Sequence, residues 1–278
     1  MPIATPKEVT DNYLNASVAK AEAPLWRLFV LAVAAGLFIG LGAVASSTAA
    51  HGLEDTGMVR FISGAIFPVG LMMVVLLGTE LFTGNALMVT AAIDGRITWA
   101  KLLRNWAIVY VGNFVGAIVL AALMAYFGQL NIGGGDLAVY TAKVAAAKCT
   151  LPWGNAFILA IFCNLLVCIA VYMGNTAHDT AGRIWAIWFP ILLFVLAGFE
   201  HCVANMYYIP AGIFALWNPA YTQLIVDAGI NTVVLDFGTF VFANLIPVTL
   251  GNIVGGALVG ILMYVTHATK KQKQNKAE

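Results

Sequence analysis

The sequence has little charge. Only 10% of its 278 residues are Asp, Glu, Lys or Arg, and 61% are hydrophobic, whereas an ordinary soluble domain is about a quarter charged and roughly half apolar. This composition excludes an ordinary water-soluble domain and predicts a protein whose main solvent is the lipid bilayer. We expect no nucleic-acid partner.

Cysteine is scarce as well, and its spacing excludes several kinds of site. The cysteines are Cys149, Cys163, Cys168 and Cys202. They form no CxxC pair and no metal-ligand spacing, so we interpret them as small core-filling residues. The chain also lacks an HExxH motif. We therefore expect no metal, no cofactor and no catalytic residues, although Glu80, Glu200 and His201 keep a membrane-embedded metal enzyme as an alternative from another class.

Six apolar stretches are long enough to cross the roughly 30 Å hydrocarbon core of a bilayer. They are Leu28–Ala50, Phe61–Ile93, Asn105–Gly135, Cys149–Ala177, Ile184–Val226 and Phe237–Thr266. The second and the fifth are too long for one simple span and contain charge, at Glu80 and at Glu200–His201. Because charged groups at membrane depth are costly and usually functional, these two stretches are where we look for function. The pattern predicts an all-α membrane protein with six transmembrane helices.

The basic residues are distributed unevenly along the chain. If the N-terminus is cytoplasmic, only Arg60, Lys143 and Lys148 lie outside. The cytoplasmic set is Lys7, Lys20, Arg27, Arg96, Lys101, Arg104, Arg183, Lys270, Lys271, Lys273 and Lys276. This asymmetry follows the positive-inside rule and predicts that both termini are cytoplasmic. Residues 1–24 then form a cytoplasmic N-terminal segment, and residues 268–278 form a basic C-terminal tail.

Two motifs occur twice, in the same order. G-x-E-x-x-x-x-N is found at 78–85 and at 198–205, and G-N-x-V-G followed six residues later by L-M is found at 112–124 and at 251–263. The first motif lies in the second span of each half, and the second motif lies in the third span. We infer a duplication of a three-helix unit.

Since three is an odd number, the second copy must enter the bilayer from the opposite side. This is the inverted-repeat arrangement of many transporters and channels, in which interrupted helices form a permeation site near the midplane. The sequence therefore predicts a single transmembrane channel domain over residues 1–278, with repeat one at about 25–130, repeat two at about 141–268, and interrupted second and fifth helices.

The repeated motifs also carry a family resemblance. GTELFTGN at 78–85, GFEHCVANMYYIPAG at 198–212, PVTLGN at 247–252 and a lysine, Lys148, sixteen residues before Asn164 resemble the formate/nitrite transporter family. The resemblance extends over nearly the whole chain. It implies an aquaporin-like fold, a homopentamer with one pore per protomer, and passage of formate, nitrite or hydrosulfide across the bacterial cytoplasmic (inner) membrane.

The resemblance also implies roles for individual residues. The central histidine of the family corresponds to His201, the threonine of the broken second helix to Thr83, the vestibule lysine to Lys148 and the paired asparagine to Asn164, with Asn252 as a further candidate donor. The implied hydrophobic constriction consists of Phe67, Leu71, Leu81 and Phe194. Taken alone, Lys148 also fits an interfacial lysine, and Asn164 also fits an interhelical hydrogen bond.

The remaining polar residues of the motifs are assigned to the helix breaks. These residues are Glu80, Glu200, Asn85 and Asn205, together with Gly78, Gly84 and Gly198. The glycines would permit the interruptions, whose unpaired backbone groups must face a cavity or other protein. We expect both glutamates to accept hydrogen bonds from the backbone donors freed there.

These residues suggest a mechanism for small monovalent anions. A bare carboxylate in an apolar constriction costs tens of kcal/mol by an idealised estimate, whereas a neutral acid or a hydrogen-bonded ion costs far less. Lys148 would raise the local anion concentration, and His201 with Thr83 would either protonate the anion or hydrogen-bond to it. The favoured function is a formate channel, with nitrite or hydrosulfide as the alternative. A water pore would show paired Asn-Pro-Ala motifs, whereas this chain has one, at 218–220.

Overall fold

The structure, a computed structural model, describes residues 3–268, and all regular secondary structure within that range is helical. The predicted basic tail lies outside the described residues except for Ala268. In chain order the helices are α1 (Pro6–Glu22), α2 (Leu25–Ala50), α3 (Thr56–Ile66), α4 (Val69–Leu76), α5 (Phe82–Asn85), η1 (Ala86–Met88), α6 (Val89–Ile93), α7 (Trp99–Tyr126), η2 (Gln129–Gly135), α8 (Asp136–Cys149), α9 (Trp153–Thr176), α10 (Thr180–Leu196), α11 (Cys202–Trp217), α12 (Pro219–Asp227), η3 (Thr232–Val234), α13 (Phe237–Thr239), η4 (Phe240–Leu245) and α14 (Ile246–His267).

Five segments of the described chain are long and apolar enough to cross a membrane. They are Leu25–Ala50, Thr56–Leu76, Trp99–Tyr126, Trp153–Thr176 and Phe237–His267. The second predicted span is interrupted between α4 and α5, and the fifth is interrupted between α10 and α11. The breaks therefore fall in the two stretches that contain the buried charges.

The connection between the halves is helical. The predicted third span ends at Gly135 and the predicted fourth span begins at Cys149, and α8 occupies the residues between them. One face of α8 is formed by small residues such as Ala142 and Ala145, and this face packs closely on α11 at Gly212. The third span also ends at Tyr126, nine residues before the predicted end at Gly135, because Gly128 turns the chain with a φ of 90°.

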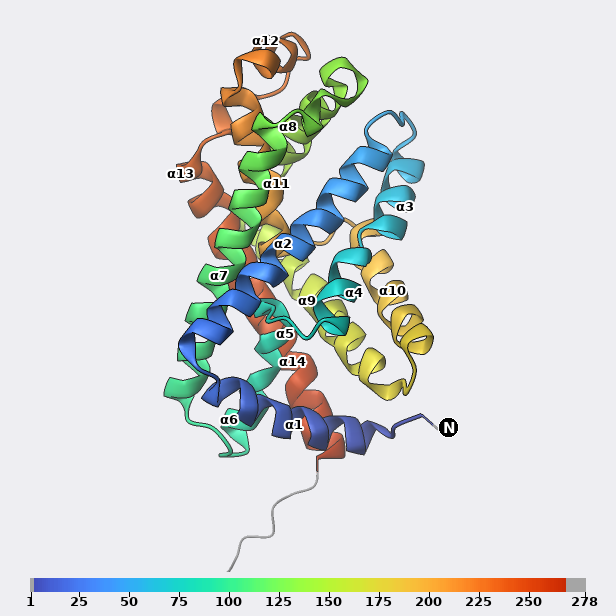
Figure 1. Ribbon diagram of the computed structural model, residues 1–278, viewed down its shortest axis with the longest axis vertical. Helices are drawn as coiled ribbons and strands as arrows, with labels where there is room; N and C mark the ends of the chain where they lie inside the picture. The colour runs from blue at the N-terminus through green and yellow to red at the C-terminus, as the bar shows by residue number, and fades with distance from the viewer. Residues whose placement is uncertain (1–2, 269–278) are drawn as a thin grey trace, which may run out of the picture.

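Glycines bring the long helices into close contact. α2 packs on α7, and α9 packs on α14 (Figure 1). A side chain at Gly116 of α7 would overlap the Val33 carbonyl of α2, and a side chain at Gly255 of α14 would overlap the Ile161 carbonyl of α9. The repeated G-N-x-V-G motif therefore provides small-residue helix packing in both halves.

The two halves run in opposite directions. α1 lies across one end of the molecule, and α12 lies near the other end (Figure 1). α2 starts at the end where α1 lies and leads away from it, whereas α9 finishes there, with the Thr176 carbonyl accepting a hydrogen bond from the Ala4 amide at 2.9 Å. These opposite courses agree with the inverted arrangement. We call the end that carries α1 the α1 face.

Candidate functional site

Each break begins at a glycine with left-handed backbone geometry. Gly78 follows α4 with a φ of 65°, and Gly198 follows α10 with a φ of 74°. Only glycine adopts this region without a steric penalty, so both residues fit the predicted role. Gly84 does not, because it lies inside α5 with ordinary helical geometry. The expectation that it permits the break is wrong.

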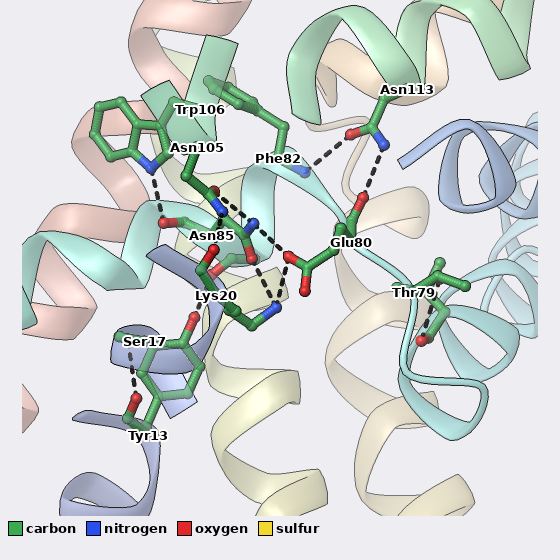
Figure 2. Close-up of polar contacts among 12 residues, drawn as sticks. Tyr13, Ser17, Lys20, Thr79, Glu80, Phe82, Asn85, Asn105, Trp106 and Asn113 are labelled. Atoms are coloured by element: carbon green, nitrogen blue, oxygen red, sulfur yellow. Dashed lines mark hydrogen bonds and ion pairs between the residues drawn. The ribbon is translucent and has the colours of Figure 1, made fainter. Parts of the chain in front are cut away.

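The first break is held by an asparagine from the third span. The Phe82 amide donates to Oδ1 of Asn113 at 2.9 Å, and Nδ2 of Asn113 donates to the Glu80 carbonyl at 2.9 Å (Figure 2). Nδ2 of Asn113 also donates to the Ala32 carbonyl of α2 at 2.7 Å. The carboxamide thus satisfies the Phe82 amide and the Glu80 carbonyl, which a continuous helix would have paired internally, and links them to α2.

The second break has the same arrangement. The Cys202 amide donates to Oδ1 of Asn252 at 2.9 Å, and Nδ2 of Asn252 donates to the carbonyls of Ala160 and Glu200 at 2.8 and 2.9 Å. Both amide hydrogens of Asn252 are therefore used by the backbone. The structure gives this residue a bracing task in place of the donor role that we expected in the pathway.

The glutamate carboxylates bind side chains. We expected them to receive backbone donors, and this is wrong, since the carboxamides of the third and sixth spans receive those donors. On the α1 face, Oε2 of Glu80 lies 2.8 Å from Nζ of Lys20 and 2.7 Å from Nδ2 of Asn85. Nδ2 of Asn85 also donates to Oδ1 of Asn105 at 2.9 Å (Figure 2).

Glu200 has an equivalent set of partners. Its Oε1 lies 2.8 Å from Nζ of Lys148, and its Oε2 accepts from Nδ2 of Asn205 at 2.7 Å. Nδ2 of Asn205 also donates to Oδ1 of Asn244 at 2.7 Å. The internal duplication therefore extends to individual side-chain contacts, with one lysine, one glutamate and two asparagines at each break.

His201 and Thr83 bring the two breaks together. Oγ1 of Thr83 lies 2.9 Å from Nε2 of His201, and both side chains are buried. His201 is also the N-cap of α11, because its Nδ1 lies 3.1 Å from the Ala204 amide. A backbone amide can only donate, so Nδ1 must accept and the ring proton must be on Nε2. The ring is thus neutral and donates to the Thr83 hydroxyl.

Asn164 positions this pair from the fourth span. Its Nδ2 donates to the Thr83 carbonyl at 3.1 Å and to the Asn252 carbonyl at 2.6 Å. The side chain therefore links the first break to the sixth span. It holds the backbone that carries the Thr83 hydroxyl.

Apolar side chains surround the polar pair. The predicted constriction residues Phe67, Leu71, Leu81 and Phe194 are all buried in one hydrophobic cluster. The Phe67 and Phe194 rings meet edge to face with centroids 5.6 Å apart, and the Phe194 and His201 rings are 6.0 Å apart. Leu81 follows Glu80 as His201 follows Glu200, so the equivalent position is apolar in one half and polar in the other.

A cavity of about 350 Å³ leads to this region from the side of α8. Lys148, Glu200, His201 and Phe194 contribute to its lining. Arg60 also lines it and donates from Nη1 to the Leu196 carbonyl at 3.2 Å, at the end of α10. The cavity therefore connects the paired lysine to the buried histidine.

The chain is also similar to known proteins. A sequence model of the formate/nitrite transporter family matches residues 7–266. The chain belongs to this family. It is 39% identical to the formate channel FocA of Haemophilus influenzae over 269 residues, 94% of each chain, and 41% identical to a probable formate transporter of Methanothermobacter thermautotrophicus, covering 88% of this chain and 90% of the relative.

A solved structure described as a pentameric formate channel with formate bound is also similar. It is 34% identical, with a TM-score of 0.78, and the match covers 87% of this chain and 96% of that one. Membership of the family confirms the predicted class, an all-α multi-pass membrane protein of the transporter and channel type. Its relatives are channels and transporters, not enzymes.

The sequence analysis did not identify several residues of this site. Asn105 and Asn244 each precede the asparagine of the G-N-x-V-G motif by eight residues, and this shared spacing could have identified them. Lys20 has no such signal, because it precedes the repeats and lies 60 residues from Glu80. Within the described residues, no group of three or more His, Cys, Asp or Glu side chains is arranged to hold a metal.

Proposed function

We propose that this chain is a channel that conducts formate across a bacterial cytoplasmic membrane. The observation that carries the proposal is the hydrogen-bonded pair of Thr83 and His201, enclosed by apolar side chains at the meeting of two broken helices. Relatives named as formate channels, and a similar structure with formate bound, support formate as the permeant. Nitrite and hydrosulfide remain the alternatives.

Different side chains have different roles in conduction. Lys148 attracts the anion into the cavity, and the ring of Phe67, Leu71, Leu81 and Phe194 rejects hydrated ions because an apolar passage cannot replace their water. Where the two breaks meet, the Thr83 hydroxyl accepts from Nε2 of His201 and can donate its own hydrogen to the permeant. A second ring proton would have to displace the Ala204 amide from Nδ1.

The proposal includes assembly and orientation. We infer a homopentamer with one pore per protomer, which a pentameric structural relative supports. The α1 face is cytoplasmic in this proposal, as the positive-inside rule predicts. Residues 1–278 form one channel domain, with repeats at about 25–130 and 141–268, and both termini lie in the cytoplasm.

The test is a side-by-side flux measurement. Purified protein in liposomes is given equal gradients of formate, nitrite or hydrosulfide, and protein-free liposomes provide the background leak. We expect formate to move fastest. Faster movement of nitrite or hydrosulfide would replace formate as the permeant, and flux no higher than the background for all three would refute a channel function.

A further inference from the structure

The end of α2 and the start of α8 lie toward the end of the molecule opposite the α1 face (Figure 1). His51 follows the last residue of α2, and Asp136 is the first residue of α8. The two helices contact each other. His51 and Asp136 are far apart in the chain and belong to no motif, so the sequence gives no sign that they lie close together.

The imidazole of His51 is oriented by the backbone of its own helix. Its Nδ1 lies 2.7 Å from the Thr48 carbonyl oxygen. A carbonyl oxygen can only accept a hydrogen bond, so Nδ1 must carry the hydrogen, and Nε2 of the neutral ring has a free lone pair. Donation from one ring nitrogen to a backbone carbonyl is also the usual support of a histidine that binds a metal through its other nitrogen.

A space without a side chain lies between this lone pair and a carboxylate. Gly133 has a φ of 67° and no Cβ. A Cβ there would lie 3.5 Å from Nε2 of His51 and 3.3 Å from Oδ2 of Asp136, so both atoms border the same small space. Neither atom has a hydrogen-bond or ion-pair partner among the described residues. Because neither atom can donate to the other, a cation that accepts lone pairs from both fits between them.

We propose that His51 and Asp136 form a binding site for a divalent transition-metal ion such as Zn²⁺. Nε2 of His51 and a carboxylate oxygen of Asp136 coordinate the ion, and water completes the coordination. The imidazole ligand favours a transition metal over Mg²⁺ and Ca²⁺, which prefer oxygen ligands. The Asp136 side chain is exposed, so rotation about its Cα–Cβ bond brings the oxygen to coordinating distance.

The bound ion bridges two elements that line the cavity. Ser47 of α2 and Tyr140 of α8 both contribute to the cavity lining, and each lies about one helical turn from a ligand of the ion. The two ligands come together only in the folded chain. An ion that binds the folded chain and not the unfolded chain stabilises the fold, so the metal should hold the end of α2 against the start of α8.

Zn²⁺ binding to the purified full-length chain tests the site. Isothermal titration calorimetry in detergent gives the affinity, and thermal unfolding with Zn²⁺ or with equal Mg²⁺ gives the stabilisation. We expect Zn²⁺ to raise the unfolding temperature more than Mg²⁺ does. His51→Asn keeps an amide that can donate to the Thr48 carbonyl but removes the coordinating nitrogen. Asp136→Asn removes the charged oxygen ligand. Each variant should bind Zn²⁺ at least about tenfold more weakly, because loss of a residue that only supports a ligand already costs that much.

Two matched controls separate this site from adventitious binding. His178→Asn removes an exposed histidine beside the start of α1, and Asp227→Asn removes an exposed aspartate at the end of α12. Both should bind Zn²⁺ as the unmodified chain does. Undiminished affinity in His51→Asn or in Asp136→Asn would overturn the site, as would an equal loss in the controls. If His51→Asn does not fold, Asp136→Asn decides, because its side chain bonds to no described residue. None of these measurements uses formate flux, so they stand apart from the test of the proposed function.

Discussion

At the scale of single residues, His201 has both a structural role and a role in hydrogen bonding at the site. Its Nδ1 caps the first turn of α11, and its Nε2 faces Thr83. The same ring therefore stabilises the second half of the broken helix and presents a donor toward the meeting point of the breaks. A substitution can separate these tasks only if it preserves the cap.

His201→Asn is such a substitution. Asn is a favoured N-cap residue, whereas loss of a capping side chain costs about 1 kcal/mol, so we expect this variant to fold and assemble. Asn is shorter than His and does not place an N–H where Nε2 of His201 meets Thr83, so formate uptake into proteoliposomes should fall by about tenfold, the factor expected for loss of one good hydrogen bond. Because both ring nitrogens of the neutral His201 are already hydrogen-bonded, the pH profile of uptake from about pH 5 to 8, where histidine usually titrates, should be the same for Asn and His. His201→Ala, which also loses the cap, is the less stable control. Undiminished uptake in His201→Asn would contradict the proposed role.

Lys148 pairs with the buried carboxylate of Glu200. It therefore has a structural role that the sequence did not predict. Lys148→Met leaves Glu200 without its cation, and breaking a buried pair costs about 3 kcal/mol or more. We expect a lower unfolding temperature, and the double variant with Glu200→Gln should recover it. Formate flux should stay reduced in both variants. The reduction should be clearest at low salt, because salt screens the field of the Lys148 ammonium group and hides its contribution. Full flux in the double variant at low salt would remove Lys148 from the pathway.

At the scale of elements, α1 connects the N-terminal segment to the first break. The Tyr13 hydroxyl donates to the Gly84 carbonyl at 2.9 Å, and Lys20 pairs with Glu80. α1 starts with a capping box in which Thr5 and Glu8 bind each other's backbone amides. The first predicted cytoplasmic segment is therefore an ordered helix that is bonded to the second span.

The capping box makes the start of α1 sensitive to acid. The hydrogen bond from the Thr5 amide lowers the pKa of Glu8 below its usual value of 4.5. A carboxyl group whose pKa is lowered by folding stabilises the helix above the usual pKa, and this stability is lost as the pH falls through the lowered value. Amide exchange in the first turn of α1, corrected for intrinsic rates, should therefore rise below pH 4.5. Glu8→Gln should remove this pH dependence, while Glu22→Gln at the exposed end of α1 should leave it unchanged.

At the scale of the whole molecule, the opposite courses of the two halves predict which surfaces face the outside. Lys143 lies exposed on α8, and Lys7 lies exposed on α1. In intact cells, Lys143→Cys should react with a membrane-impermeant thiol reagent, whereas Lys7→Cys should react only after lysis. The native cysteines are all buried and give little background. Reversed labelling of these two variants would overturn the proposed orientation.

The assembly is predicted at the same scale. The chain has a mass of 29.6 kDa, and we expect native mass measurement in detergent to return five copies. Exposed apolar side chains on α7 and α14, such as Val111 and Leu258, provide surface for contacts with lipid or with neighbouring protomers. A stable monomer or tetramer would contradict the pentamer.

Much of this architecture could be predicted from the chain alone, because its signals are local. Composition and the length of the apolar stretches determine that the protein lies in a membrane, and the duplicated motifs mark the second and fifth spans as the broken ones. Gly78 and Gly198 could be assigned to the breaks because a left-handed turn needs glycine wherever it occurs. α8 was missed because its small residues are buried only through contact with α11.

The chemistry of the site depends on contacts between segments that are distant in the chain. The tautomer of His201 is set by the direction of the Ala204 amide, which exists only once α11 has formed after the break. The partner of Glu80 comes from α1, and its backbone neighbours are braced by Asn113 from the third span. Sequence by itself determined the class, the duplication and the position of the breaks, whereas only the tertiary structure decided which polar atoms are paired, because hydrogen bonding depends on distance and direction in space.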